Sequence, residues 1–338
     1  MNLLILGGTV FLGRHLVSAA KAAGHSVTTF NRGTNNLPEQ DSPDLEKVLG
    51  DRNQESDLAR LAGAGKTWDA VIDTCGYTPP AVAASATALK DCAGKYVFIS
   101  SISAYQDFRQ TGMDETAPLR KKPIDGEDDY GSLKAACETE VSRVYGDNAI
   151  CVRAGLIVGP FDSTDRFTYW PGRVAAGGKV LAPGNPDRQV QFIDVRDLSD
   201  WILRVVASDG SGAYNATGPN FPLSMDHFLD ECKAATESDA EFVWLSDEEL
   251  TAAGVEDWTQ LPLWLPESNE DFRGFMSIDC TKAHVAELTY RPLADTIRDT
   301  LTWDRTRDAA LPRKAGLPPE RETELLTAHA AAASAQIS

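Results

Sequence analysis

Short apolar runs alternate with amphipathic stretches along the first two-thirds of the chain. The apolar runs have the length and the near-continuous hydrophobicity of strands buried on both faces of a parallel sheet. They lie at residues 2–6, 26–30, 47–50, 69–73, 95–100 and 149–153. Stretches with helical spacing lie between them, at residues 11–23, 55–62, 80–90 and 130–145. This alternation predicts an α/β fold with a doubly wound parallel sheet, whose ligands bind at the carboxyl ends of its strands.

The pattern becomes irregular after about residue 159. Gly, Pro, Asp and aromatic residues are frequent in residues 161–190, whereas residues 191–208 again predict a short strand followed by a helix. We therefore expect a first domain and a smaller C-terminal lobe. The predicted bounds are 1–160 with a return at 191–220 for the domain, 161–190 and 221–320 for the lobe, and 321–338 for a terminal helix with a frayed tail.

Charge and cysteine content narrow the class of protein. The 338 residues include 50 acidic and 32 basic side chains, a net charge of −18, which disfavours binding to nucleic acid or to an anionic membrane. No apolar run approaches the roughly 18 residues that a membrane-spanning helix needs. The six cysteines are scattered without a CxxC pair, which predicts free thiols in a reducing, cytoplasmic setting: Cys75, Cys92, Cys137, Cys151, Cys232 and Cys280. The five histidines show no metal-ligand spacing, so no metal is expected.

A glycine-rich turn follows the first predicted strand, in the sequence ILGGTVFLGRH at residues 5–15. Gly7 and Gly8 leave the strand and Gly13 lies one turn into the next helix, as in a loop that holds a pyrophosphate. These glycines predict a Rossmann-type dinucleotide-binding domain, with the lobe binding the substrate. A plain turn between a strand and a helix is the alternative interpretation, because Val10 stands where a further glycine would be expected.

The end of the second predicted strand indicates which dinucleotide binds. NAD enzymes commonly place a carboxylate there for the ribose 2′-hydroxyl, but this chain has Asn31 and Arg32. An amide and a guanidinium favour the 2′-phosphate of NADP. We therefore expect NADP as the preferred cofactor and NAD as the alternative. An exposed turn residue is the other interpretation of Arg32.

The candidate catalytic residues lie in DYGSLK, residues 129–134. Tyr130 and Lys134 are four residues apart on a predicted helix and therefore share one face. A nearby ammonium lowers the pKa of a phenol from about 10, so Tyr130 becomes a candidate general acid/base. The predicted strand 95–100 runs into Ser101, which places a hydroxyl at the sheet edge where the ligand is expected.

Together these motifs make the chain resemble the short-chain dehydrogenase/reductase superfamily, in its extended or atypical, NAD(P)-dependent epimerase/dehydratase-like branch. The resemblance covers about residues 1–220 and is carried by GGTVFLG, ISSISAY, YGSLK, RAGLIVGP, QFIDVRDL and YNATGP. It implies that Ser101 polarises the substrate oxygen, that Tyr130 transfers the proton, and that Lys134 holds the nicotinamide ribose. It implies a homodimer through the helices at 80–90 and 130–145.

The resemblance also implies which residues contact the cofactor. It places Asp51 and Arg52 beside the adenine, and Ala154 and Gly155 near the nicotinamide. The complete expected cofactor set is Gly7, Gly8, Thr9, Val10, Phe11, Gly13, Asn31, Arg32, Asp51, Arg52, Thr74, Cys75, Gly76, Tyr130, Lys134, Ala154 and Gly155.

Three departures from the family pattern bear on the reaction. Ile102 and Ser103 stand where sugar-nucleotide dehydratases carry two acids, so the residues for elimination are missing. Leu156 and Val190 replace the Asn and Arg that sugar-nucleotide epimerases use for the substrate diphosphate, with Arg188 as a nearby substitute.

The resulting hypothesis is an NAD(P)-dependent oxidoreductase that moves hydride to or from a carbinol or ketone carbon of a small polar metabolite. A sugar or sugar-nucleotide epimerase with tightly held cofactor is the alternative, and a non-catalytic RNA-binding member is a third.

Two minor expectations concern the second half of the chain. Asp197 is expected to cap a helix beginning at Leu198. Four residues are expected either to grip a substrate or to pack the lobe: Arg166, Tyr169, Trp170 and Arg173.

Overall fold

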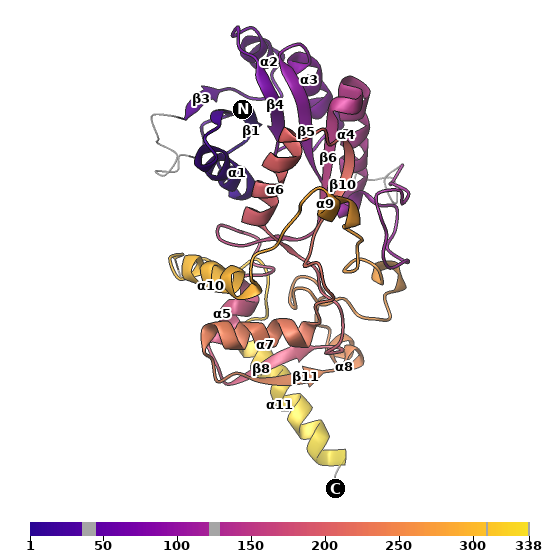
Figure 1. The fold of residues 1–338 in the computed structure, drawn as a ribbon. Coiled ribbons are helices and arrows are strands. Elements are labelled where there is room, and N and C mark those ends of the chain that lie inside the picture. Colours follow the sequence, from indigo (N-terminus) through magenta and orange to yellow (C-terminus); the bar gives the residue numbers. More distant parts are fainter. Residues whose placement is uncertain (36–44, 122–128, 309, 337–338) are drawn as a thin grey trace. The chain divides into compact units, whose positions relative to one another are not determined.

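The computed structural model describes residues 1–35, 45–121, 129–308 and 310–336, and it divides the chain into two compact units (Figure 1). The first unit comprises residues 1–157, 193–218 and 278–290, and the second comprises 158–192, 219–277 and 291–338. Residues 337–338 of the predicted tail lie outside the described residues. Among the described residues, no helix is long and apolar enough to cross a membrane.

A seven-stranded parallel sheet forms the centre of the first unit. Its strand order is β10-β6-β5-β4-β1-β2-β3, which confirms the predicted doubly wound α/β fold. The strands are β1 (Asn2–Leu6), β2 (Ser26–Asn31), β3 (Glu46–Leu49), β4 (Trp68–Asp73), β5 (Ala93–Ser101), β6 (Ala149–Ala154) and β10 (Gly212–Ala216). The two-residue strands β7 (Ile157–Val158) and β9 (Ile193–Asp194) pair with each other.

Helices cover both faces of this sheet because alternate side chains of each strand point to opposite sides. In β1, Leu3 and Ile5 join the hydrophobic cluster under α1 (Phe11–Ala22) and α6 (Val195–Ala207). Leu4 and Leu6 join the cluster under the helices of the other face. These helices are α2 (Glu55–Ala62), α3 (Pro79–Leu89) and α4 (Tyr130–Tyr145), and α3 packs against α4.

Short elements complete the first unit. A 3₁₀ turn, η2 (Ile102–Ala104), follows β5, and another, η4 (Gly146–Asn148), follows α4. The helix α9 (Thr281–Val285) belongs to this unit, although the sequence pattern placed residues 278–290 in the lobe. The segment returns because Trp201 Nε1 donates to the carbonyl of Ala286 at 3.0 Å and Tyr290 donates to the carbonyl of Thr217 at 2.6 Å.

The helix α6 begins earlier than the sequence pattern suggested. Asp194, in extended backbone geometry, caps it by accepting a hydrogen bond from the backbone N–H of Arg196 at 2.8 Å, and the helix begins at Val195. The expectation that Asp197 is the cap is therefore wrong. Asp197 lies in the first turn, where a carboxylate interacts favourably with the positive end of the helix dipole.

The second unit contains a two-stranded parallel sheet of β8 (Lys179–Pro183) and β11 (Glu241–Leu245), with six helical elements among its described residues. These are α5 (Tyr169–Ala175), α7 (Met225–Thr236), α8 (Asp247–Ala252), η5 (Glu270–Phe272), α10 (Leu293–Asp304) and α11 (Pro319–Gln336). Trp170 is fully buried and donates to the Pro262 carbonyl at 2.9 Å, and Arg173 pairs with Glu322 at 2.6 Å. These two residues therefore pack the interior of this unit.

Candidate functional site

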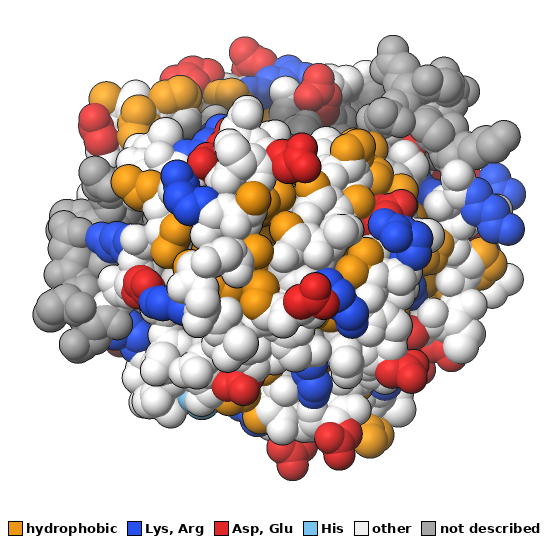
Figure 2. Space-filling view, turned by 90° about the horizontal axis from the view of Figure 1, so that it is seen from above, with side chains coloured by type: hydrophobic (Ala, Val, Ile, Leu, Met, Phe, Trp, Pro, Cys, Tyr) orange, Lys and Arg blue, Asp and Glu red, His pale blue; other side chains and the backbone are white. Residues whose placement is uncertain are grey.

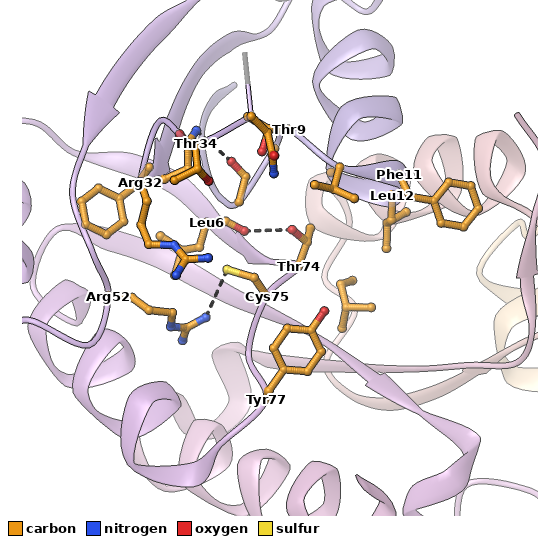
Figure 3. Close-up of a pocket in the computed structure, with 18 of the residues that line it drawn as sticks. Leu6, Thr9, Phe11, Leu12, Arg32, Thr34, Arg52, Thr74, Cys75 and Tyr77 are labelled. Carbon is orange, nitrogen blue, oxygen red and sulfur yellow. Dashed lines mark hydrogen bonds between the residues drawn. The ribbon is translucent and has the colours of Figure 1, made fainter. Parts of the chain in front are cut away.

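A cavity of about 530 Å³ opens at the carboxyl ends of the parallel strands in the first unit (Figure 3). Its volume lies in the range usual for cofactor sites. The residues that line it lie at or just after the carboxyl ends of the strands β1 to β6, or in the first two turns of α1 and α4. All of the residues expected to be catalytic line the cavity, and so do all expected cofactor residues except Gly76.

The glycine loop is built for close approach. Gly7 and Gly8 have φ of +104° and +88°, which side-chain-bearing residues rarely adopt. A β-carbon on Gly13 would lie 2.7 Å from the backbone nitrogen of Gly8, so only glycine lets α1 pack this closely against the turn. The loop therefore retains the geometry that lets backbone N–H groups approach a pyrophosphate.

Val10 does not obstruct this loop. It is the residue before α1, its φ of −123° suits any residue, and its side chain is 56% exposed. Glycine is therefore not required at this position. The backbone strain falls instead on the next residue, Phe11, whose φ is +25°.

Asn31 ends β2 and Arg32 follows it, and both residues line the cavity. Asn31 Nδ2 donates to the Gly7 carbonyl at 3.1 Å, and its Oδ1 accepts from the Gly33 N–H at 2.9 Å. Asn31 therefore uses one of its two amide hydrogens to hold the loop together, and its contact with the cofactor stays a prediction. Arg32 is exposed, and its guanidinium has no partner among the described residues, which leaves it available to an anion.

Asp51 and Arg52 follow β3 and line the same cavity. The Arg52 guanidinium forms a bidentate ion pair with the buried Asp73, at 2.5 and 2.8 Å, and donates to Ser85 at 2.5 Å. Burial disfavours the Asp73 charge, but Arg52 outweighs it and lowers the pKa of that carboxyl. The guanidinium of Arg52 thus fixes the cavity wall, and its expected contact with the adenine stays a prediction.

Lys134 is held rigidly beneath the cavity. Its Nζ donates to the carbonyls of Gly76 and Ile99, both at 2.8 Å, which places Gly76 behind the site rather than on its surface. Burial lowers the pKa of the Lys134 ammonium. A lysine has three N–H donors, so one remains for a ligand.

Tyr130 and Ser101 complete the expected catalytic set. The Tyr130 ring lies 5.7 Å from Lys134 Nζ and is 51% exposed at the cavity. Ser101 Oγ accepts from the N–H of Ser103 at 3.1 Å, which caps η2 and leaves the hydroxyl hydrogen available to a ligand oxygen.

A buried polar network joins the elements that carry these residues. Ser100 and Arg153 face each other across β5 and β6, and both bond to Glu138 of α4, at 2.5 Å for Ser100 and 2.8 Å for the shortest Arg153 contact. Arg153 also donates to the Tyr105 hydroxyl at 3.1 Å, and Tyr105 donates to Asn215 at 2.6 Å. The network therefore fixes α4 relative to the strand end that bears Ser101.

Several cavity residues were missed by the sequence argument. Tyr77 is the most prominent, because its aromatic side chain is 58% exposed and lies 5.0 Å from Lys134 Nζ. Its signal in the sequence, a single aromatic residue after Gly76, is too weak to identify it. The other missed residues that line the cavity are Leu6, Leu12, Phe30, Gly33, Thr34, Asn35, Gly50, Asn53, Ile99, Ser100 and Ile157.

A doubly wound parallel sheet with a glycine loop at the carboxyl end of its first strand defines an α/β protein of the Rossmann type. The sequence model of the NAD dependent epimerase/dehydratase family matches residues 3–217, so the chain belongs to that family. The expected resemblance is confirmed.

Curated relatives carry different names. The chain is 26% identical over 248 residues to the chloroplast stem-loop binding protein of 41 kDa b of Arabidopsis thaliana, covering 69% of this chain and 63% of that protein. It is 32% identical over 221 residues to the 2′-dehydrokanamycin reductase of Streptomyces kanamyceticus, covering 62% of this chain and 59% of the reductase. The chain thus spans about three-fifths of the length of these two relatives.

Solved structures share the fold. The Bordetella bronchiseptica enzyme WbmH, in complex with NAD⁺, has a TM-score of 0.67 at 18% identity, covering 90% of this chain and 98% of that one. The UDP-N-acetylglucosamine 4-epimerase of Bacillus cereus has a TM-score of 0.67 at 16% identity, covering 92% of this chain and 99% of that one. At these identities the likeness establishes the architecture alone.

Proposed function

We propose that this protein is an NADP-preferring oxidoreductase that moves hydride between the cofactor and a carbinol or ketone carbon of a small polar metabolite. The observation that carries the proposal is the convergence of Ser101, Tyr130 and Lys134 on the cavity that the glycine loop borders. The cavity fits a dinucleotide because a β-carbon at Gly13 would fill the space that the backbone of the loop needs.

The chain's own residues supply the proton chemistry. A bound nicotinamide dinucleotide would supply the hydride donor or acceptor. Ser101 donates its hydroxyl hydrogen to the substrate oxygen and thereby polarises the carbon–oxygen bond. Tyr130 gives a proton to that oxygen or takes one from it. Lys134 favours the phenolate form of Tyr130 by its charge and offers its third N–H to the cofactor ribose.

Arg32 supports the preference for NADP over NAD. Its exposed guanidinium is available at the end of β2, where a 2′-phosphate would need a cationic partner. The family description names NAD, and WbmH was solved with NAD⁺. The proposed preference for NADP therefore rests on this chain's own Arg32 and not on its relatives.

Calorimetric titration with NADPH and NADH tests the proposal. We expect tighter binding of NADPH, and a loss of about tenfold or more in NADPH affinity on Arg32→Ala, with little change for NADH. Arg298→Ala, which removes an exposed arginine of the second unit, is the control and leaves both affinities unchanged. Equal affinities for NADPH and NADH would disprove the preference, and no binding of either nucleotide would overturn the oxidoreductase assignment.

The substrate we propose has no nucleoside diphosphate. Val190 is 1% exposed within the second unit, and its N–H donates to the Leu223 carbonyl at 2.8 Å, so its position offers no polar anchor. Leu156 likewise lacks the amide that epimerases use. The reductase from Streptomyces kanamyceticus, named for an aminoglycoside ketone, supports a ketone on a free sugar-like ring as the substrate class.

An epimerase is the second candidate, because solved relatives with the same fold include sugar-nucleotide 4-epimerases. Such an enzyme would oxidise and re-reduce one carbon and would retain its cofactor. Absorbance of the reduced nicotinamide separates the two candidates during turnover. Net oxidation of NADPH with a ketone supports the reductase, and interconversion of a sugar without net change supports the epimerase.

A non-catalytic RNA-binding role is the third candidate, favoured by the name of the Arabidopsis relative. The net charge of −18 opposes it. On the face shown in Figure 2, Lys and Arg side chains are mixed with Asp and Glu rather than gathered into a basic stripe.

We propose a cytoplasmic protein, supported by the six free cysteines, and a dimer formed through α3 and α4.

A further inference from the structure

Two phenol rings flank the Lys134 ammonium at the cavity. Nζ of Lys134 lies 5.0 Å from the centre of the Tyr77 ring and 5.7 Å from that of the Tyr130 ring. A third ring, Phe98, lies 4.7 Å from the same atom but is fully buried. Tyr77 therefore presents an open aromatic surface at the place where the proposed function already puts Tyr130.

The backbone on both sides of Tyr77 is fixed. The carbonyl of Gly76 accepts from Lys134 Nζ at 2.8 Å, and a β-carbon on Gly76 would lie 2.7 Å from the Phe98 ring. On the other side, Thr78 is the residue before α3, whose first turn begins with Pro79. The ring is thus carried by a constrained turn, and Figure 3 shows it standing in the cavity beside Cys75.

Tyr77 differs from Tyr130 in its chemistry. Burial raises the pKa of the Tyr77 phenol, and the neighbouring Cys75 and Asp73 raise it further. Tyr77 is therefore a neutral phenol at neutral pH. Its hydroxyl has no hydrogen-bond partner within the part of the chain that the structure describes. A neutral, half-exposed ring beside a fixed cation is suited to contact with a flat or sugar-like ligand group.

We propose that Tyr77 forms an aromatic wall for the nicotinamide-ribose half of the cofactor and holds that half against Lys134. This inference rests on the proposed function, which places the nicotinamide at Ser101, Tyr130 and Lys134. The adenosine half lies with the glycine loop and Arg32, which other strands carry. Tyr77 therefore contributes to binding of the whole dinucleotide and not to binding of its adenosine fragment.

Titration with two probes tests the inference. NADPH carries the nicotinamide half, and 2′,5′-ADP lacks it while keeping the 2′-phosphate. We expect Tyr77→Ala to weaken NADPH binding about tenfold, and to leave 2′,5′-ADP binding unchanged within about twofold. Tyr77→Phe, which keeps the ring, should bind both probes as the unaltered protein does. Phe221→Ala is the control, because it removes another exposed aromatic side chain from the second unit.

The fluorescence of bound NADPH gives a second readout, since it reports the surroundings of the nicotinamide. Tyr77→Ala should change the emission of the bound cofactor, whereas Tyr77→Phe should preserve it. Equal losses for NADPH and 2′,5′-ADP would overturn the inference, as would unchanged NADPH binding in Tyr77→Ala or an equal loss in Tyr77→Phe. Failure of the unaltered protein to bind either probe would overturn the proposed function itself, so the two failures are distinguishable.

Discussion

Gly131 and Ser103 approach so closely that a β-carbon on Gly131 would lie 2.1 Å from the carbonyl oxygen of Ser103. Gly131 follows Tyr130 in the first turn of α4. Ser103 lies in η2, the 3₁₀ turn that begins directly after Ser101. The missing side chain at Gly131 therefore allows the element carrying Tyr130 and the element carrying Ser101 to come together.

Replacing Gly131 should separate these two elements. We expect Gly131→Ala to lower the free energy of unfolding by about 1–3 kcal/mol, because the methyl group must displace backbone. The proposed carbonyl reduction should fall by at least about tenfold, since small displacements of the groups proposed as catalytic are costly. Gly172→Ala in α5 is the matched control, because its β-carbon would make only ordinary contacts, at 3.4 and 3.5 Å. Chemical denaturation of both variants measures the difference, and equal stabilities would contradict the expectation.

Val10 and Gly13 should respond in opposite ways to substitution. Val10→Gly should change NADPH affinity by no more than about twofold, because Val10 already has an ordinary φ and an exposed side chain. The added backbone freedom of glycine accounts for a small loss of affinity within this range. Gly13→Ala should abolish binding, since its methyl group would collide with the backbone of Gly8. Calorimetry on both variants tests this. A large gain in affinity on Val10→Gly would show that the valine impairs the loop.

The Glu138–Arg153 pair should be far more sensitive than a surface pair on the same helix. Glu138→Gln leaves Arg153 charged and buried, so we expect a loss of about 3–5 kcal/mol in the free energy of unfolding. Glu140→Gln breaks the exposed pair with Arg143 on α4 and should cost less than about 1 kcal/mol. Urea denaturation compares the two variants, and similar losses would argue against the buried network.

Asp73 should make stability depend on acidity. Its pKa is lower in the folded protein than in the unfolded chain, so its contribution is present above the unfolded value of about 3.9. That contribution is lost as the pH falls through the lower, folded value. The stability gap between the unaltered protein and Asp73→Asn should therefore narrow as the pH drops below about 4. Denaturation curves across this range provide the test, and a gap independent of pH would exclude this role for Asp73.

Much of this architecture follows from residue patterns. The six predicted strands and four predicted helices of residues 1–154 all occur, because long alternation of buried strands and amphipathic helices admits few arrangements. The motif spacing also predicted that Ser101, Tyr130 and Lys134 lie at one site, and all three line the same cavity. Their catalytic roles remain predictions.

Other features depend on contacts that no local pattern encodes. Asn31 is engaged by Gly7 and Gly33, and this use of its amide becomes visible only when the turn is folded. Arg52 pairs with Asp73, 21 residues away in sequence, and neither residue belongs to a motif that announces the other. Tyr77 is a cavity residue because of where Gly76 places it, which the sequence order alone does not reveal.

The return of residues 278–290 to the first unit has a consequence for biosynthesis. The indole N–H of Trp201 on α6 donates to the carbonyl of Ala286. Gly218 packs so closely against the Tyr290 ring that a β-carbon on Gly218 would lie 2.1 Å from a ring carbon. The first unit therefore cannot finish folding on the ribosome until about residue 290 has left the exit tunnel. The second unit is completed later still, because α10 and α11, which belong to it, lie after residue 290.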